Sequence, residues 1–232
     1  MAQGEWTYMR GFLNLFSKKH PFRPQPNQPL ELEWRESGVP ECILYVSVVE
    51  LQRRKLVVQA NRELPLKLGP GSKLRVCSLS PPWFQSYNAN LLQVSGNRLE
   101  LSLPNQDDLE NHQVPQFDEG QKVDFATPAD YQASRSPYRQ TAEVIAVGRK
   151  GLTLQTKVSI PSQTQLDLQL KLPDRNEPLP AQVKAVASTN LSESKKYATE
   201  VEFVAIPEPE LQALWDVALR HHLRVTTRGE EP

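Results

Sequence analysis

The sequence predicts a mainly β protein of two small antiparallel β-barrels, with a helix at each end of the chain. Leucines alternate with polar residues over residues 166–172, and again over residues 152–155. A period of two predicts strands with one buried face and one wet face. A short turn at residues 148–151 separates two apolar runs, as in a β-hairpin. The 20 prolines and few aromatic residues suit many short strands joined by turns.

Composition limits the possible functions. With 232 residues, the chain is long enough for two modest domains or one large β-domain. Its 27 basic and 27 acidic residues balance, so no overall field attracts nucleic acid or anionic membrane. The basic tracts at residues 53–55 and 195–196 lack interleaved aromatic residues. We therefore expect no nucleic-acid binding.

The cysteines point to a reducing compartment. Cys42 and Cys77 are the two cysteines of the chain, too few for a disulfide framework. We find no signal-peptide pattern and no apolar run of membrane-spanning length. The expected localisation is cytoplasmic.

Residues 1–29 are expected to form an N-terminal helix and a linker. Over residues 4–19, apolar residues at helical spacing predict an amphipathic helix. Such a helix binds a membrane or a partner, or packs on its own barrel. We expect the packed form, because the polar face carries little positive charge. Residues 21–29 contain four prolines and predict a semi-rigid spacer.

Residues 30–128 are assigned to an N-terminal barrel. The strand–turn–strand form recurs at residues 42–59, 89–103 and 142–155, which indicates related barrels in tandem. Residues 106–116 are polar and predict a loop. Residues 127–136 predict the connection between the barrels. The expected strands are residues 30–34, 43–49, 56–58, 73–78, 87–94 and 98–103.

Residues 129–232 are assigned to a C-terminal barrel that ends in a helix. Pro207 and Pro209 flank the expected first turn of this helix, where proline is tolerated. The helix is expected to run from residue 208 to about residue 223. Its predicted buried stripe is Leu211, Leu214, Trp215, Ala218 and Leu223.

The pattern over residues 135–223 resembles a PilZ domain. A strand leads to a turn that ends in Gly151-Leu152, and a leucine-rich strand ends in Leu172-Pro173. A closing strand at residues 197–203 is similar to the family's GVEF-type strand, and a helix follows. Residues 30–126 loosely resemble the N-terminal barrel of flagellar-brake-type proteins. The resemblance implies a cytoplasmic signalling module in the cyclic di-GMP network.

PilZ domains typically bind cyclic di-GMP through an RxxxR segment and a [DN]xSxxG turn. In the family, a complete strand follows RxxxR before the strand that leads to the second motif. Here Arg135 and Arg139 match RxxxR, and residues 146–151 keep only the final Gly151 of the second motif. Guanidinium groups grip phosphate with paired hydrogen bonds and stack on purines.

The predicted ligand site therefore comprises Arg135, Arg139, Gly148, Arg149 and Gly151. Arg149 would attract phosphate through its charge, and the two glycines are expected to supply the positive φ of the turn. In the alternative interpretation, these arginines are solvated and the turn is an ordinary hairpin.

Patterns of catalysis and metal binding are missing from the sequence. We find no glycine-rich phosphate loop, GxSxG or HExxH. His221 and His222 are adjacent on a predicted helix and point about 100° apart, which does not suit a shared metal. We expect no enzymatic activity, no metal and no cofactor, with cyclic di-GMP as the possible ligand.

The expected function is a receptor or an adaptor that acts on a partner protein to control motility, pili or surface polysaccharide. The alternative is a structural or protein-interaction barrel that binds no nucleotide.

Overall fold

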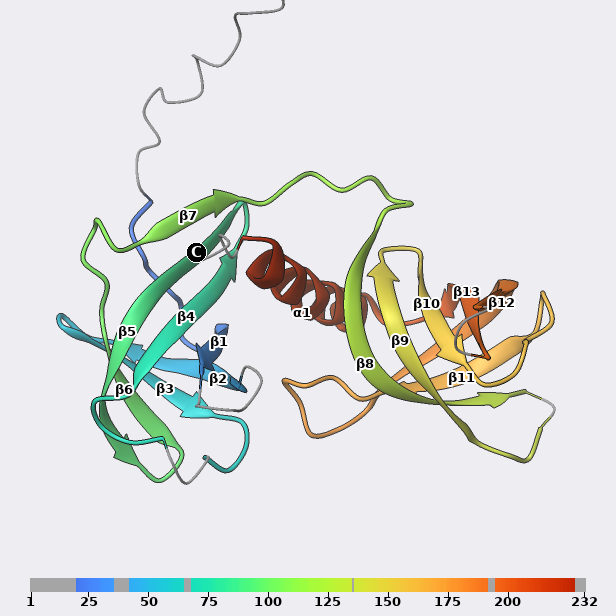
Figure 1. The fold of residues 1–232 in the computed structure, drawn as a ribbon, viewed down its shortest axis with the longest axis horizontal. Helices are drawn as coiled ribbons and strands as arrows, with labels where there is room; N and C mark the ends of the chain where they lie inside the picture. Colours follow the sequence, from blue (N-terminus) through green and yellow to red (C-terminus); the bar gives the residue numbers. More distant parts are fainter. Residues whose placement is uncertain (1–19, 36–41, 65–67, 135, 192–194, 228–232) are drawn as a thin grey trace, which may run out of the picture.

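The structure is a computed structural model, and it describes residues 20–35, 42–64, 68–134, 136–191 and 195–227. Within these ranges the chain forms strands β1 to β13 and helix α1 (Figure 1). The predicted mainly β architecture is therefore confirmed. The predicted N-terminal helix at residues 4–19 lies outside the described residues, as does Arg135.

The first barrel is a closed ring of six antiparallel strands. β4 pairs with both β1 and β5, which closes the order β4-β1-β2-β3-β6-β5 into a ring. The predicted hairpins at residues 43–58 and 87–103 are confirmed as β2–β3 and β5–β6. The strands are β1 (Pro29–Trp34), β2 (Cys42–Leu51), β3 (Lys55–Ala60), β4 (Lys73–Ser80), β5 (Trp83–Ser95) and β6 (Arg98–Ser102).

The segment at residues 106–116 is not a simple loop. It contains β7 (Glu110–Gln113), which pairs with the first residues of β5. The polar sequence of β7 gives no alternation signal, so its backbone pairing was not predictable from the pattern.

The second barrel is also closed by six antiparallel strands, in the order β10-β13-β12-β11-β8-β9. Helix α1 (Glu208–Thr226) follows its last strand, as expected. The strands are β8 (Lys122–Ala133), β9 (Gln140–Gly148), β10 (Gly151–Thr156), β11 (Gln165–Leu170), β12 (Leu179–Leu191) and β13 (Lys196–Ala205).

The predicted connection at residues 127–136 is wrong over most of its length. β8 continues to Ala133. It therefore crosses the predicted boundary between the two barrels, which lies between residues 128 and 129. Small buried residues such as Ala129 make its alternation weak in the sequence. Pro128 is accommodated next to a register shift between Asp124 and Thr127. The connection between the barrels instead lies between β7 and β8.

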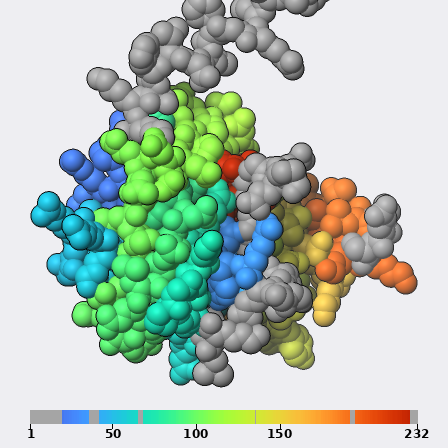
Figure 2. Space-filling view, turned by 60° about the vertical axis from the view of Figure 1, so that its left-hand side comes forward, coloured from blue at the N-terminus to red at the C-terminus, as the bar shows by residue number. Residues whose placement is uncertain are grey.

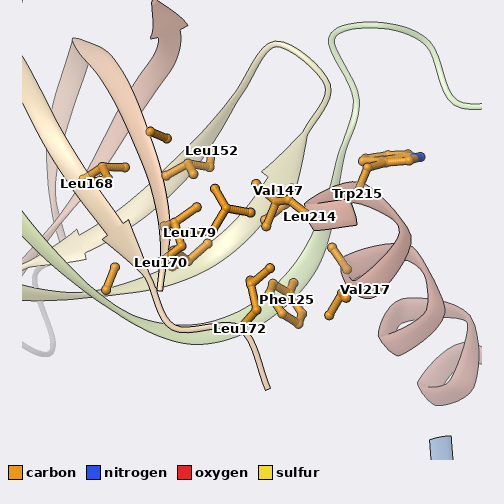
Figure 3. Packing of buried hydrophobic residues seen from close by; sticks show 14 of the residues in the cluster. Phe125, Val147, Leu152, Leu168, Leu170, Leu172, Leu179, Leu214, Trp215 and Val217 are labelled. Carbon is orange, nitrogen blue, oxygen red and sulfur yellow. The ribbon is translucent and has the colours of Figure 1, made fainter. Parts of the chain in front are cut away.

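Helix α1 lies between the two barrels (Figure 1). In Figure 2, seen from the side of the first barrel, the second barrel lies behind and to the right. Leu214 and Val217 of α1 face Val147, Leu172 and Phe125 of the second barrel (Figure 3). The same hydrophobic cluster includes residues of β4 and β5. The predicted stripe is confirmed except for Leu211, which is only half-buried.

Strand β1 is buried on both faces, although leucine and glutamate alternate along it, a pattern typical of a strand with one wet face. Leu30 and Leu32 are fully buried in the core of the first barrel. Glu31 and Glu33 are also buried, with exposures of 0% and 3%. Arginines of α1 contact the outer face of β1, which the strand pattern alone does not indicate.

A buried charge cluster joins α1 to β1. Arg220 Nε donates a hydrogen bond of 2.9 Å to Glu31 Oε1. Arg224 Nε lies 2.9 Å from Glu31 Oε2 as an ion pair, without the alignment of a hydrogen bond. Both arginines are 1% exposed, and Arg220 also lies 3.7 Å from Asp174 of the second barrel. A buried carboxylate costs several kcal/mol unless it is paired, so Glu31 depends on α1.

Candidate functional site

The candidate site begins at the turn between β9 and β10. Gly148 pairs with Lys122, at the start of β8. A Cβ at position 148 would lie 2.8 Å from the Gln121 carbonyl oxygen. A Cβ at position 151 would lie 2.0 Å from the Val201 carbonyl oxygen. Both glycines therefore let neighbouring backbones approach closely.

The prediction that these glycines supply positive φ is wrong. Among the described glycines, positive φ occurs at Gly71 and Gly96 and not at Gly148 or Gly151. The space beside this turn is thus taken up by the protein's own backbone.

The side chain of Arg149 contacts helix α1. Its guanidinium carbon lies 5.5 Å from the centre of the Trp215 ring. Phe117, from the connection between the barrels, meets the same indole edge-on with ring centres 5.5 Å apart. A guanidinium over an indole face is attracted by the ring's quadrupole. Arg149, Trp215 and Phe117 form what we call the turn cluster.

Lys150 contacts the same connecting segment. Its Nζ lies 2.6 Å from Glu119 Oε2. Their mutual hydrogen bond lowers the pKa of Glu119 and raises the pKa of Lys150. Both groups are exposed, so the pair contributes little stability, but it places a carboxylate beside the turn.

Acidic residues of β13 balance the remaining cations near the turn. Glu202 is paired across the strands with Gly151, and Glu200 with Thr153. Lys122 Nζ makes an ion pair with Glu200 and a 3.0 Å hydrogen bond to Thr153 Oγ1. The cations Lys122, Arg149 and Lys150 are thus matched by Glu119, Glu200 and Glu202. The turn carries no net excess of positive charge.

Arg139 lies at the opposite end of β9. The loop of residues 134–139 joins β8 to β9 next to the Tyr131–Gln140 pair, whereas Gly148 pairs with Lys122 at the far end. Arg139 precedes β9 by one residue, and at a rise of about 3.3 Å per residue the nine steps from Arg139 to Gly148 separate the two by about 30 Å. The structure therefore groups Gly148, Arg149 and Gly151, and it does not bring Arg139 to them.

Tyr138 and Arg139, between β8 and β9, are open to solvent. Tyr138 is 74% exposed, and Arg139 is exposed without an ion pair or side-chain hydrogen bond to any residue that the structure describes. Arg135 falls outside the described ranges.

Sequence reasoning missed the contribution of Phe117, Glu119 and Trp215 to the turn. The order of strands in the sequence could have indicated that residues 114–121 lie near the turn. This order places β8 between residues 114–121 and β9, the strand that leads to the turn. The 114–121 segment, VPQFDEGQ, contains no arginine. Arg135 and Arg139, which match RxxxR, instead come between β8 and β9 in the sequence.

The described ranges show neither a metal-binding cluster nor a membrane span. Across them, no group of three or more His, Cys, Asp or Glu side chains is placed to hold a metal ion. Within the same ranges, no helix combines the length and the apolar character needed to cross a membrane.

Solved structures resemble this chain. The Bacillus subtilis inhibitor of motility MotI/DgrA is 14% identical, with 89% of this chain and 100% of that chain covered and a TM-score of 0.40. The K. pneumonia MrkH–c-di-GMP complex is 13% identical, with 88% and 90% covered and a TM-score of 0.40. YcgR from Escherichia coli in complex with c-di-GMP is 9% identical, with 86% and 87% covered and a TM-score of 0.34.

No protein-family model and no curated protein sequence matches the chain. Because the structural similarities have TM-scores below 0.5, the function of this chain is inferred from the geometry of its own barrels.

Proposed function

We propose that the protein is a non-enzymatic, PilZ-like signalling adaptor of the cytoplasm, which acts on a partner protein in the control of motility, pili or surface polysaccharide. The support is the PilZ-like order of strands, turn and helix in the second barrel. The observation that favours an adaptor over a receptor is the turn cluster, in which the exposed Arg149 side chain already contacts the Trp215 ring.

The electrostatics of the turn also favour an adaptor. A cyclic dinucleotide carries two negative charges and needs cations that are free to meet them. Lys122 and Lys150 are engaged by Glu200 and Glu119. Moving Arg149 away from the indole costs about 0.5–1 kcal/mol, before any repulsion from the carboxylates is overcome. The turn offers neither the Asp or Asn nor the Ser of the family motif.

A cyclic di-GMP receptor is the second candidate, and one observation favours it. The exposed Tyr138 ring lies next in sequence to the exposed Arg139, so the 134–139 loop offers a stacking surface and a free guanidinium. Such a receptor would use this loop rather than the β9–β10 turn.

Calorimetric titration of the full chain with cyclic di-GMP separates the two candidates. The adaptor proposal expects no saturable binding to the wild type. Binding that falls about ten- to a hundredfold in Arg139→Ala would instead establish a receptor, since one charged hydrogen bond is worth roughly 1.5–3 kcal/mol. Binding that depends on Arg149 and not on Arg139 would contradict both assignments and restore the turn as the site.

The adaptor proposal also predicts that partner binding is independent of the nucleotide. Once a partner has been captured, its affinity for the full chain should be equal with and without cyclic di-GMP. A nucleotide-dependent change in that affinity would overturn the proposal.

A further inference from the structure

A recess between the two barrels, which we call the inter-barrel pocket, lies on a different side of α1 from the turn cluster. Its volume is about 640 Å³, within the range of about 300–1,000 Å³ that is typical of small-molecule sites. The β11–β12 connection forms one wall and reaches from the second barrel toward the first below α1 (Figure 1). The other walls come from β2, from Arg62 just after β3, from the middle of β8 and from His221 of α1.

The pocket is separate from the turn cluster. His221 lies six residues after Trp215 on α1, which places it about 240° further round the helix. Residues 125–128 of β8 line the pocket, and Thr127 and Pro128 pair with the middle of β9 rather than with its end at Gly148.

Positive charge dominates the polar lining. Arg62, Lys171 and Arg175 line the pocket, and Glu177 is the acidic residue among the lining side chains. Lys171 pairs with Asp130 at 2.9 Å, and Arg175 with Glu210 at 2.6 Å. These pairs engage one donor group of each cation and leave others for a ligand.

Arg62 is the free cation of the pocket. Its side chain is exposed, and no carboxylate in the described part of the chain forms an ion pair with it. A guanidinium without a partner at the mouth of a pocket is available for a bidentate contact with phosphate or carboxylate.

Two neutral donors add to these cations. Arg224 Nη2 lies 2.9 Å from His221 Nδ1, and because a guanidinium only donates, Nδ1 accepts. Burial and the charge of Arg224 lower the pKa of His221, so the neutral ring carries its proton on Nε2. Burial raises the pKa of the Tyr45 hydroxyl, which therefore also stays protonated. Neither donor has a hydrogen-bond partner among the described residues.

Apolar side chains complete the lining. They come from β2, β8 and the β11–β12 connection, so both barrels contribute to the pocket. A mostly apolar cavity with a few convergent donors is the usual form of a site for a small organic ligand. The apolar lining comprises Ile43, Phe125, Ala126, Pro128, Leu172, Pro173 and Pro178.

We propose that the inter-barrel pocket binds a small organic phosphate of nucleotide size. Arg62, assisted by Lys171 and Arg175, holds the phosphate, and the organic part packs against Ile43 and the prolines of the lining. This proposal is independent of the adaptor proposal, because it uses none of the residues of the turn cluster.

Isoleucine methyl groups provide a local test. Ile43, Ile145, Ile160 and Ile206 are the four isoleucines of the chain, and Ile43 lines the pocket. In the full chain labelled with ¹³C at isoleucine methyl groups, 5′-GMP should shift the Ile43 signal in a saturable way and leave that of Ile160 unchanged. Ile43→Val assigns the signal. Guanosine, which lacks only the phosphate, should bind at least about tenfold more weakly.

The matched variants are Arg62→Gln and Arg53→Gln. Arg53 is an exposed arginine in the β2–β3 turn and does not line the pocket. Arg62→Gln should weaken GMP binding about ten- to a hundredfold, and Arg53→Gln should leave it unchanged. Equal melting temperatures would show that both variants fold as the wild type does. An unshifted Ile43 signal, equal binding of GMP and guanosine, or equal affinity in Arg62→Gln and wild type would each overturn the proposal.

Discussion

The two ends of strand β9 differ in how many contacts their side chains and backbone make with the rest of the protein. At the Gly148 end, backbones approach too closely for a Cβ, and the side chains of Arg149 and Lys150, although exposed, contact Trp215 and Glu119. At the Gln140 end, Tyr138 and Arg139 are exposed.

The contrast shows that a match to a sequence motif does not by itself locate a binding site. The RxxxR pattern matches in full at the open end, about 30 Å from the turn that it would have to serve. The turn itself lies beside residues 114–121, whose Phe117 and Glu119 occupy its surroundings. Substitutions at each end should therefore change stability to very different extents.

The largest effect is expected at Trp215. Trp215→Ala removes a side chain that is 3% exposed and contacts both Arg149 and Phe117. The free energy of unfolding should fall by about 3–5 kcal/mol, measured by urea denaturation. Trp215→Phe, as the control, should recover a large part of the loss. An unchanged urea midpoint in Trp215→Ala would show that the indole does not hold the turn end of β9.

The next effect is expected at Gly151. In Gly151→Ala the new Cβ would meet a backbone oxygen of β13 at 2.0 Å, so the two strands must move apart. Overpacking of this kind costs about 1–3 kcal/mol, and the fall in melting temperature measures it. Gly120→Ala is the matched control, because no atom lies within 4 Å of the Cβ that it adds. Equal melting temperatures of the two variants would contradict the close approach of β10 and β13.

A smaller effect is expected at Arg149. Arg149→Gln removes the contact of the guanidinium with the Trp215 ring and should cost about 0.5–1 kcal/mol. A double-mutant cycle with Trp215→Leu, which removes the aromatic ring, isolates the coupling between the two side chains. Zero coupling would mean that Arg149 is solvated and available to a ligand.

The smallest effect is expected at the open end. Arg139→Ala should change the free energy of unfolding by less than about 0.5 kcal/mol, because the side chain is exposed and without partners in the described structure. A loss as large as that of Arg149→Gln would remove the contrast between the two ends.

Much of the fold follows from local patterns. The alternating leucines of β11 and the hairpins β2–β3 and β5–β6 lie where periodicity predicts strands, because each buries one face in its own barrel. The alternating leucines of β10 also lie in a strand, but Thr153 between them is buried as well, so the predicted wet face is wrong there. The helix begins next to Pro207 as its proline signal indicates.

Other features depend on contacts between distant segments. The acidic face of β1 is buried because arginines some 190 residues later cover it, which no local pattern reveals. β7 forms because the start of β5 offers an edge. At the candidate site, the sequence identified the turn by its glycines, but the partners of Arg149 and Lys150 come from α1 and the connecting segment.

The pairing of Glu31 with Arg220 has a consequence for synthesis on the ribosome. The two residues are 189 positions apart, so the first barrel emerges long before the helix that neutralises its buried carboxylate. At about 5–20 residues per second, the interval is on the order of 10–40 seconds. During that interval Glu31 is hydrated or protonated, and the outer face of β1 is open to other chains. The first barrel is therefore synthesised first, but its buried carboxylate is paired only when α1 has been made.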